Sequence, residues 1–102
     1  MRHRVAYWSV GTAELYALLR RLAPPGLELL TLATGEEAER LALAAEAEAV
    51  VVAASRFTEA HLAAARRLRF VQHQGVGWQD TVAWQGLAAR GIPLATTPQG
   101  TT

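Results

Sequence analysis

The chain has 102 residues, of which 51% are hydrophobic, and a formal net charge of +1. This length suits one domain with a single core, and the small net charge gives no support for a nucleic-acid partner. The chain has no cysteine, which excludes disulfides, thiolate catalysis and cysteine-bound metals. All ten basic residues are arginine, and the absence of lysine excludes Schiff-base chemistry and P-loop phosphate binding.

Strand and helix signals alternate along the first half of the chain. Val5–Trp8 predicts a strand, and leucines then recur at helical spacing up to Pro24-Pro25-Gly26, which ends the helix. A second strand is expected at 27–32. Thr34–Glu37 fits a capping box, with Thr34 as the N-cap and Glu37 returning to its backbone N–H.

The second half continues the alternation. Ala49–Ala53 has no polar residue, which is typical of a strand buried on both faces of a parallel sheet. Thr58 is expected to cap a helix that has Arg66 and Arg67 in its last turn. The remaining expected elements are a strand at 70–72, a helix from about residue 80 to 90 that ends at Gly91, and a strand at 92–96.

Repeated strand–helix units with short connections predict an α/β fold. Right-handed crossovers place helices on both faces of a parallel sheet. For about five strands, a flavodoxin-like doubly wound sheet in the order 2-1-3-4-5 is the natural arrangement.

The most informative motif is Gln74-Gly75-Val76-Gly77, directly after the fourth expected strand. Two glycines one residue apart allow a tight bend and bring bare N–H groups close to an anion. A carboxylate at the carboxyl end of a parallel strand would fit there, although a strand-to-helix turn without a ligand explains the spacing equally well. A nucleotide fingerprint does not fit, because Asp80 stands where the third glycine belongs.

The loop after the third strand lies at the same expected edge of the sheet. Ser55 could donate a hydrogen bond to a ligand or satisfy free N–H groups at the next helix start. Arg56 could bind an anion or lie in solvent.

The other polar and aromatic candidates have simpler structural readings. His73 reads as a polar residue at a strand end, and His3 and His61 as surface residues without the spacing of a metal site. Trp78 and Trp84 would pack the fourth helix or line an apolar pocket. The acidic residues around the second helix read as a solvated face; they are Glu36, Glu37, Glu39, Glu46 and Glu48.

Taken together, several blocks resemble the D-isomer-specific 2-hydroxyacid dehydrogenases, the phosphoglycerate dehydrogenase-like family. The blocks are Leu68–Gln72, Gly75–Gly77, Ala88–Pro93 and Thr96–Pro98. The resemblance spans roughly 49–102, while the first half agrees only in its strand–helix pattern. It implies that residues 1–97 are the N-terminal part of the substrate-binding domain and that 98–102 begin the crossing to an NAD-binding domain absent from this chain.

The resemblance also implies a function and a site. The parent enzyme would transfer a hydride between NAD or NADP and a small D-2-hydroxy or 2-oxo acid. Gln74, Gly75, Val76 and Gly77 would bind the substrate carboxylate, with Ala54 and Ser55 opposite. Val52-Ala53 replaces the Arg-Ser that phosphoglycerate-specific members carry, which argues against a phosphorylated substrate.

The family's catalytic arginine, glutamate and histidine lie beyond this chain. We therefore expect the 102 residues alone to be inactive, without a catalytic or cofactor-binding residue or a metal of their own. A C-terminal segment completes this domain in the family, so we expect exposed apolar surface and self-association, for example as a homodimer.

The alternative is a stand-alone flavodoxin-like module that binds a small ligand or acts as a signalling receiver. A receiver would need acidic residues after the first strand, an aspartate after the third and a lysine after the fifth, which this chain lacks. A flavin module would need a phosphate loop richer in Ser and Thr than Ser9–Thr12.

The remaining expectation concerns location. No apolar run is long enough to span a membrane, and the start of the chain lacks the pattern of a secretory signal. The sequence therefore predicts a cytoplasmic protein without a membrane partner.

Overall fold

The computed structural model describes residues 3–53, 55–74 and 78–97. Five strands form one sheet in the order β2-β1-β3-β4-β5, with every neighbouring pair parallel, as predicted. The strands are β1 (His3–Tyr7), β2 (Leu27–Leu30), β3 (Ala49–Val52), β4 (Phe70–Gln74) and β5 (Leu94–Thr97). The helices are α1 (Ala13–Leu22), α2 (Glu37–Glu46), α3 (Glu59–Ala64), α4 (Trp78–Thr81) and α5 (Trp84–Ala89).

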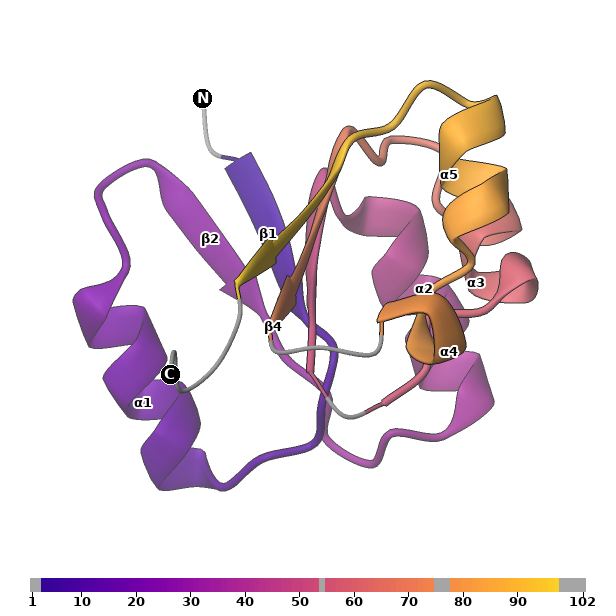
Figure 1. Ribbon diagram of the computed structural model, residues 1–102. Helices are drawn as coiled ribbons and strands as arrows, with labels where there is room; N and C mark the ends of the chain where they lie inside the picture. The colour runs from indigo at the N-terminus through magenta and orange to yellow at the C-terminus, as the bar shows by residue number, and fades with distance from the viewer. Residues whose placement is uncertain (1–2, 54, 75–77, 98–102) are drawn as a thin grey trace.

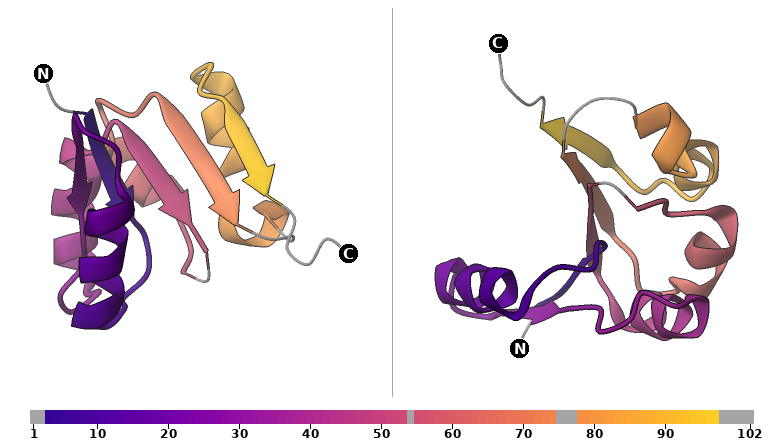
Figure 2. Two further views of the ribbon diagram at one scale, coloured as in Figure 1. Left: turned by 90° about the vertical axis from the view of Figure 1, so that its left-hand side faces the viewer. Right: turned by 90° about the horizontal axis from the view of Figure 1, so that it is seen from below.

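The helices divide unequally between the two faces of the sheet. Figure 1 shows α1 on one face and the other four helices on the opposite face. The hydrophobic core lies on the side of the four helices, where Ala6, Val50, Val52 and Val71 are completely buried. In the second view of Figure 2, seen along the sheet, α1 stands alone on its side.

This unequal cover corrects the prediction for β3. Val50 and Val52 are buried, but Ala49 and Val51 point to the other face and are only partly covered. Among the described residues, the only helix on that face is α1, which packs against β2 and reaches β1 through the Tyr16 and Tyr7 rings. An all-apolar strand was therefore wrongly read as buried on both sides.

The same face explains why the leucine stripe of α1 is not buried. Tyr16 is the buried residue of this helix, whereas Leu18 and Leu22 are 41% and 71% exposed. The helical spacing is confirmed, and Leu15 and Leu19 are half-buried. In the described residues, however, α1 lies only at the β1–β2 side of the sheet, where Tyr16 packs edge-on against Tyr7 of β1 with ring centroids at 6.4 Å.

The start of α2 differs from the predicted capping box. The helix begins at Glu37, and the carboxylate of Glu39 reaches back to accept the backbone N–H groups of residues 33, 34 and 35 at 2.7, 2.9 and 2.8 Å. Glu39 also accepts the Thr34 hydroxyl at 3.1 Å. These hydrogen bonds favour the charged carboxylate and lower the pKa of Glu39 to about 2.

This carboxylate makes stability depend on acid pH. Because its pKa is about 2 in the folded chain against an ordinary 4.5, the stabilisation is complete above about pH 4.5 and is lost as pH falls toward 2. We expect Glu39→Gln to lower the urea midpoint at pH 7 and to flatten its decline between pH 4.5 and 2. Glu36→Gln, at a position without a side-chain capping bond, is the control. Equal slopes for wild type and Glu39→Gln would contradict the assignment.

The end of α3 is also capped differently from the prediction. The helix stops at Ala64, so Arg66 and Arg67 lie beyond it. Its terminal carbonyls instead receive the guanidinium of Arg90, which donates to Leu62 O at 2.8 Å and Ala65 O at 2.9 Å. Arg90, at the end of α5, thus caps the C-terminus of α3, a role that the sequence analysis gave to Arg66 and Arg67.

The single helix predicted from about residue 80 to 90 is two short helices. Val82 pairs with Phe57 in an isolated parallel bridge. Phe57 donates its N–H to Thr81 O at 2.7 Å and accepts the N–H of Ala83 at 2.9 Å. These long-range bonds use the backbone groups that a continuous helix would need. Gly91 follows α5 with φ of 70°, as predicted for a C-terminal glycine.

The described residues contain neither a membrane-spanning helix nor a cluster of metal-binding side chains. No helix in residues 3–53, 55–74 and 78–97 is long and apolar enough to cross a bilayer. The same part of the chain holds no group of three or more His, Cys, Asp or Glu side chains arranged to bind a metal.

Candidate functional site

The candidate site lies where the parallel strands end. Because all five strands run the same way, the loops that follow β1, β3 and β4 meet at one edge of the sheet. Val52 at the end of β3 is in register with His73, and β4 extends one residue further to Gln74. The sheet therefore brings the loop after β3 beside the start of the predicted glycine turn.

The structure describes part of the predicted substrate-binding set. Gln74 is the last residue of β4 and is exposed at the edge, and Ser55 is half-buried in the loop after β3. Gly75, Val76, Gly77 and Ala54 lie outside the described residues. The two described members therefore come from neighbouring strands of the same edge.

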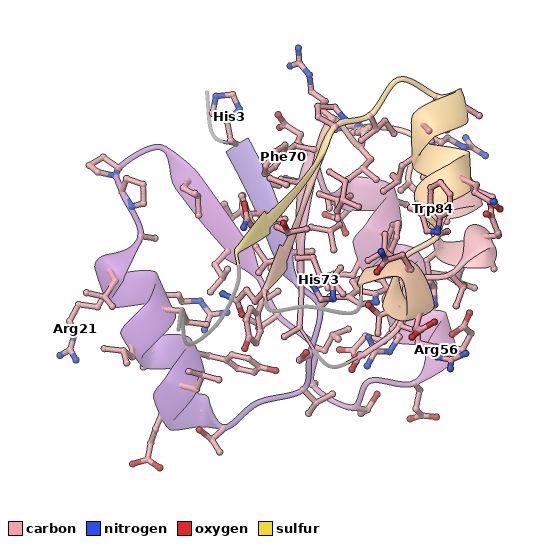
Figure 3. The ribbon with its side chains drawn as sticks, in the orientation of Figure 1. His3, Arg21, Arg56, Phe70, His73 and Trp84 are labelled. Atoms are coloured by element: carbon pink, nitrogen blue, oxygen red, sulfur yellow. The ribbon has the colours of Figure 1, made fainter. Side chains whose placement is uncertain are left out.

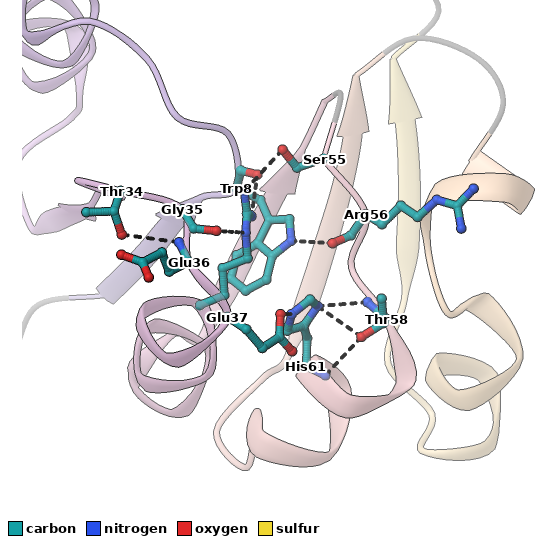
Figure 4. A network of polar contacts seen from close by, with 10 residues as sticks. Trp8, Thr34, Gly35, Glu36, Glu37, Ser55, Arg56, Thr58 and His61 are labelled. Atoms are coloured by element: carbon teal, nitrogen blue, oxygen red, sulfur yellow. Dashed lines mark hydrogen bonds and ion pairs between the residues drawn. The ribbon is translucent and has the colours of Figure 1, made fainter.

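Ser55 is held by Arg40, a residue that sequence analysis did not single out. The Arg40 guanidinium donates from Nη2 to Ser55 Oγ at 3.3 Å, from Nη1 to Trp8 O at 3.2 Å and from Nε to Gly35 O at 2.9 Å. Figure 4 shows these partners converging on one point from the loops after β1, β2 and β3. One side chain from α2 thus joins three loops at the carboxyl edge.

Trp8 packs beneath the guanidinium of Arg40 and its three loop partners. Its indole is completely buried, donates from Nε1 to Arg56 O at 2.8 Å and lies 5.2 Å from the Arg40 guanidinium in a cation–π arrangement. Phe57 and His61 pack edge-on against it, with ring centroids at 5.1 and 4.9 Å. The loop after β3 is therefore fixed through both its backbone and Ser55.

His61 corrects the surface assignment made from sequence. It is 3% exposed, and its Nδ1 accepts the Thr58 N–H at 3.0 Å while its Nε2 lies 3.0 Å from Glu37 Oε1. Thr58 caps α3 as predicted, with His61 completing the capping box. His3, with 65% of its side chain exposed, is at the surface as predicted.

The acidic residues are not simply a solvated face. Besides Glu37 and Glu39, Glu46 accepts Arg4 Nη1 at 2.8 Å and Glu48 Oε1 lies 3.1 Å from His3 Nδ1. The hydrogen bond with His3 lowers the pKa of Glu48. These pairs could not be predicted from the helix sequence, because Arg4 and His3 come from β1 and the partner of Glu37, His61, comes from α3.

His73 faces the core rather than the edge. It is 1% exposed, and its Nε2 lies 2.8 Å from Thr81 Oγ1, which joins β4 to α4. Figure 3 shows the ring between the sheet and α4. A polar residue at a strand end was the correct reading, and in addition this contact positions the helix that follows the glycine turn.

Two surface hollows flank α4 and α5. One, of about 200 Å³, lies between the loop after β3 and α4, with Arg56, Glu59 and Asp80 in its wall. The other, of about 380 Å³, is mostly apolar and is lined by Trp84, Leu87, Ala88, Ile92, Leu94 and Thr96. Trp84 therefore lines a pocket, one of its two predicted uses, while the side chain of Trp78 lies outside the described residues.

Some polar groups of the loop after β1 and of the start of α1 are bonded within the protein, whereas the buried Ser9 Oγ has no hydrogen-bond partner among the described residues. Gly11 N donates to the Tyr16 hydroxyl at 2.7 Å, and Leu15 N donates to Thr12 Oγ1 at 3.0 Å. The Tyr16 hydroxyl in turn donates toward Leu32 O at 2.8 Å. The amides of Gly11 and Leu15 and the Tyr16 hydroxyl are therefore engaged with the protein itself.

Comparisons with known proteins agree with this architecture. Residues 9–102 match the family model described as D-isomer specific 2-hydroxyacid dehydrogenase, catalytic domain. No curated protein sequence matches.

Two solved structures share the fold at low sequence identity. The PH0520 protein of Pyrococcus horikoshii OT3 aligns with a TM-score of 0.67 and 20% identity over 95% of this chain and 28% of its own. An NAD+-bound 3-phosphoglycerate dehydrogenase of Entamoeba histolytica aligns with a TM-score of 0.78 and 14% identity over 96% of this chain and 33% of its own. The chain thus spans about a third or less of each. On the family match, this chain belongs to the D-isomer specific 2-hydroxyacid dehydrogenases, within their catalytic domain.

Proposed function

We propose that this chain supplies the substrate-carboxylate site of an NAD- or NADP-dependent oxidoreductase that acts on a small D-2-hydroxy or 2-oxo acid. The backbone N–H groups of Gly75, Val76 and Gly77 bind the carboxylate, with Gln74 and the loop at Ala54 and Ser55 beside them. The observation that carries this proposal is the position of Gln74 and Ser55 at adjoining strand ends in a chain of this family.

The residues of this chain do not themselves fit a nucleotide. Asp80, in α4, occupies the position where a dinucleotide fingerprint has its third glycine. A bound nicotinamide would supply hydride chemistry from a different domain of the parent enzyme. The role left to this chain is to bind and orient the acid, and self-association through the half-covered sheet face is part of the same proposal.

A flavin-binding module is the weaker alternative. In a sheet of this order, flavin phosphate binds at the switch point between β1 and β3. The Arg40 guanidinium bridges the loops after β1 and β3 there, and the Gly11 amide is bonded to the Tyr16 hydroxyl. Both observations favour a ligand site further along the edge, toward β4.

The proposal is tested with oxalate, a small planar dicarboxylate that resembles a 2-oxo acid. In an amide chemical-shift titration of the 102-residue chain, we expect saturable shifts at residues 74–77 and at Ser55. Ser55→Ala should weaken binding about tenfold, the value of one hydrogen bond to a charged group. Thr31→Ala, which removes a hydroxyl bonded to Arg20 beside the outermost strand β2, is the matched control.

Activity gives the second readout. We expect the chain alone to show no NAD binding by calorimetry and no NADH oxidation with glyoxylate, hydroxypyruvate or pyruvate. Turnover by the purified chain, or oxalate shifts confined to another part of the surface, would overturn the proposal.

A further inference from the structure

The position of Arg40 bears on how Ser55 can meet a ligand. Arg40 belongs to α2, in the part of the chain that carries no recognisable motif, yet its guanidinium reaches the loop after β3. A guanidinium has only donors, so in the contact with Ser55 the serine oxygen must be the acceptor. The single hydroxyl hydrogen of Ser55 is then free to point elsewhere and to act as a donor.

We propose that Arg40 is a positioning residue that holds Ser55 with its hydroxyl hydrogen directed to the substrate carboxylate. This inference rests on the proposed function, since it assumes that the acid binds at this edge. It adds a residue from α2 to a site otherwise built from the loops after β3 and β4. Its ligand is a carboxylate, because an oriented O–H donor serves an anion.

The surroundings of Arg40 fix its geometry. Three acceptors from three loops surround the guanidinium, and its planar face lies over the buried Trp8 ring. Gly35, whose carbonyl accepts from Arg40 Nε, has φ of 77°, a backbone conformation that favours glycine. The three hydrogen bonds and the Trp8 ring restrict the side chain to one orientation, which a positioning residue requires.

The charge of Arg40 strengthens the same effect. A cation bonded to the serine oxygen polarises the O–H group and makes it a better donor to an anion. Lysine could not fully replace Arg40. Its three N–H donors are all on one nitrogen, so they cannot reach three acceptors as widely separated as those around the guanidinium.

The test is a double-mutant cycle on oxalate affinity, measured by the amide shifts of the full 102-residue chain. Arg40→Met keeps a long side chain over Trp8 and should weaken oxalate binding about fivefold, less than complete loss of the Ser55 donor. In a Ser55→Ala background the same change should weaken binding by less than about twofold, because Arg40 acts through Ser55.

The matched control is Arg20→Met. Arg20 also donates to a hydroxyl, Thr31 Oγ1 at 3.0 Å, but in the α1–β2 region. It should leave oxalate affinity unchanged. If circular dichroism shows that Arg40→Met does not fold, Arg40→Leu, which also removes every donor and the charge, replaces it in the same cycle, with the same coupling to Ser55 expected.

The outcomes separate this inference from the proposed function. If the wild-type chain does not bind oxalate at residues 74–77, the proposed function and this inference both fail. If the wild type binds and Arg40→Met binds equally well, only the inference fails. An Arg40 effect that persists undiminished in Ser55→Ala would show direct attraction of the anion and would also overturn it.

Discussion

Trp8→Ala is expected to remove about 3–5 kcal/mol of unfolding free energy. The indole is completely buried in the core, so its removal leaves a cavity against Phe57 and His61. The Arg56 carbonyl loses its hydrogen bond and Arg40 loses the aromatic face beneath it. Because a domain of this size has only about 5–15 kcal/mol in total, the variant should be partly unfolded or close to it.

The measurement is urea denaturation followed by far-ultraviolet circular dichroism, which does not depend on the removed chromophore. Trp8→Phe is the matched variant: it retains most of the aromatic packing but leaves the Arg56 carbonyl without the indole donor. It should cost about 1–2 kcal/mol, mainly from the lost hydrogen bond and the smaller ring. A midpoint for Trp8→Ala within error of wild type would show that this ring does not anchor the edge.

His61→Ala has the second largest expected effect, a loss of about 3 kcal/mol. The substitution creates a cavity beside Trp8 and leaves the Thr58 N–H without its acceptor. It also breaks the contact between α2 and α3 through Glu37. Since Nδ1 accepts the backbone N–H, Nε2 must carry the hydrogen that is donated to Glu37.

Two further variants separate packing from capping. His61→Gln can still complete a capping box, so about 1 kcal/mol of the loss should return, while the ring packing stays lost. Glu37→Gln should cost less than about 1 kcal/mol, because Glu37 is largely exposed and a surface ion pair contributes little. Equal destabilisation by His61→Ala and Glu37→Gln would contradict a buried packing role for the histidine. His61 touches Trp8, so the two large effects should not add.

The positions of Gln74 and Ser55 in the fold could be predicted because their signals are local. The paired glycines, the preceding strand and Thr58 as a cap are visible as neighbours in sequence, and these gave the edge of the sheet and the position of Gln74 and Ser55. Arg40 had no such signal. It lies 15 residues before Ser55, and one arginine in an alanine-rich helix carries no mark of the three loops that it joins.

Three of the errors share one cause, a partner that is distant in sequence, whereas the capping of α2 by Glu39 involves residues only four to six positions away. The helix expected from about residue 80 to 90 was broken by Phe57, and the end of α3 was capped by Arg90 instead of its own arginines. His61 reads as a polar helix residue until α2 brings Glu37 to it. Hydrophobic periodicity predicts which residues share one face of a helix or strand, but not which other segment packs against that face.

By itself, the sequence determined the order of strands and helices, the parallel sheet and the strand-end position of the glycine motif. Alternating apolar segments, prolines and glycines act over a few residues, and right-handed crossovers then leave few topologies. Only the tertiary structure decided which face of the sheet is well covered, which acids and histidines are paired, and that Arg40 reaches Ser55. Those outcomes depend on contacts between segments that only folding brings together. The free energies of such contacts cannot be predicted from the sequence of either segment alone.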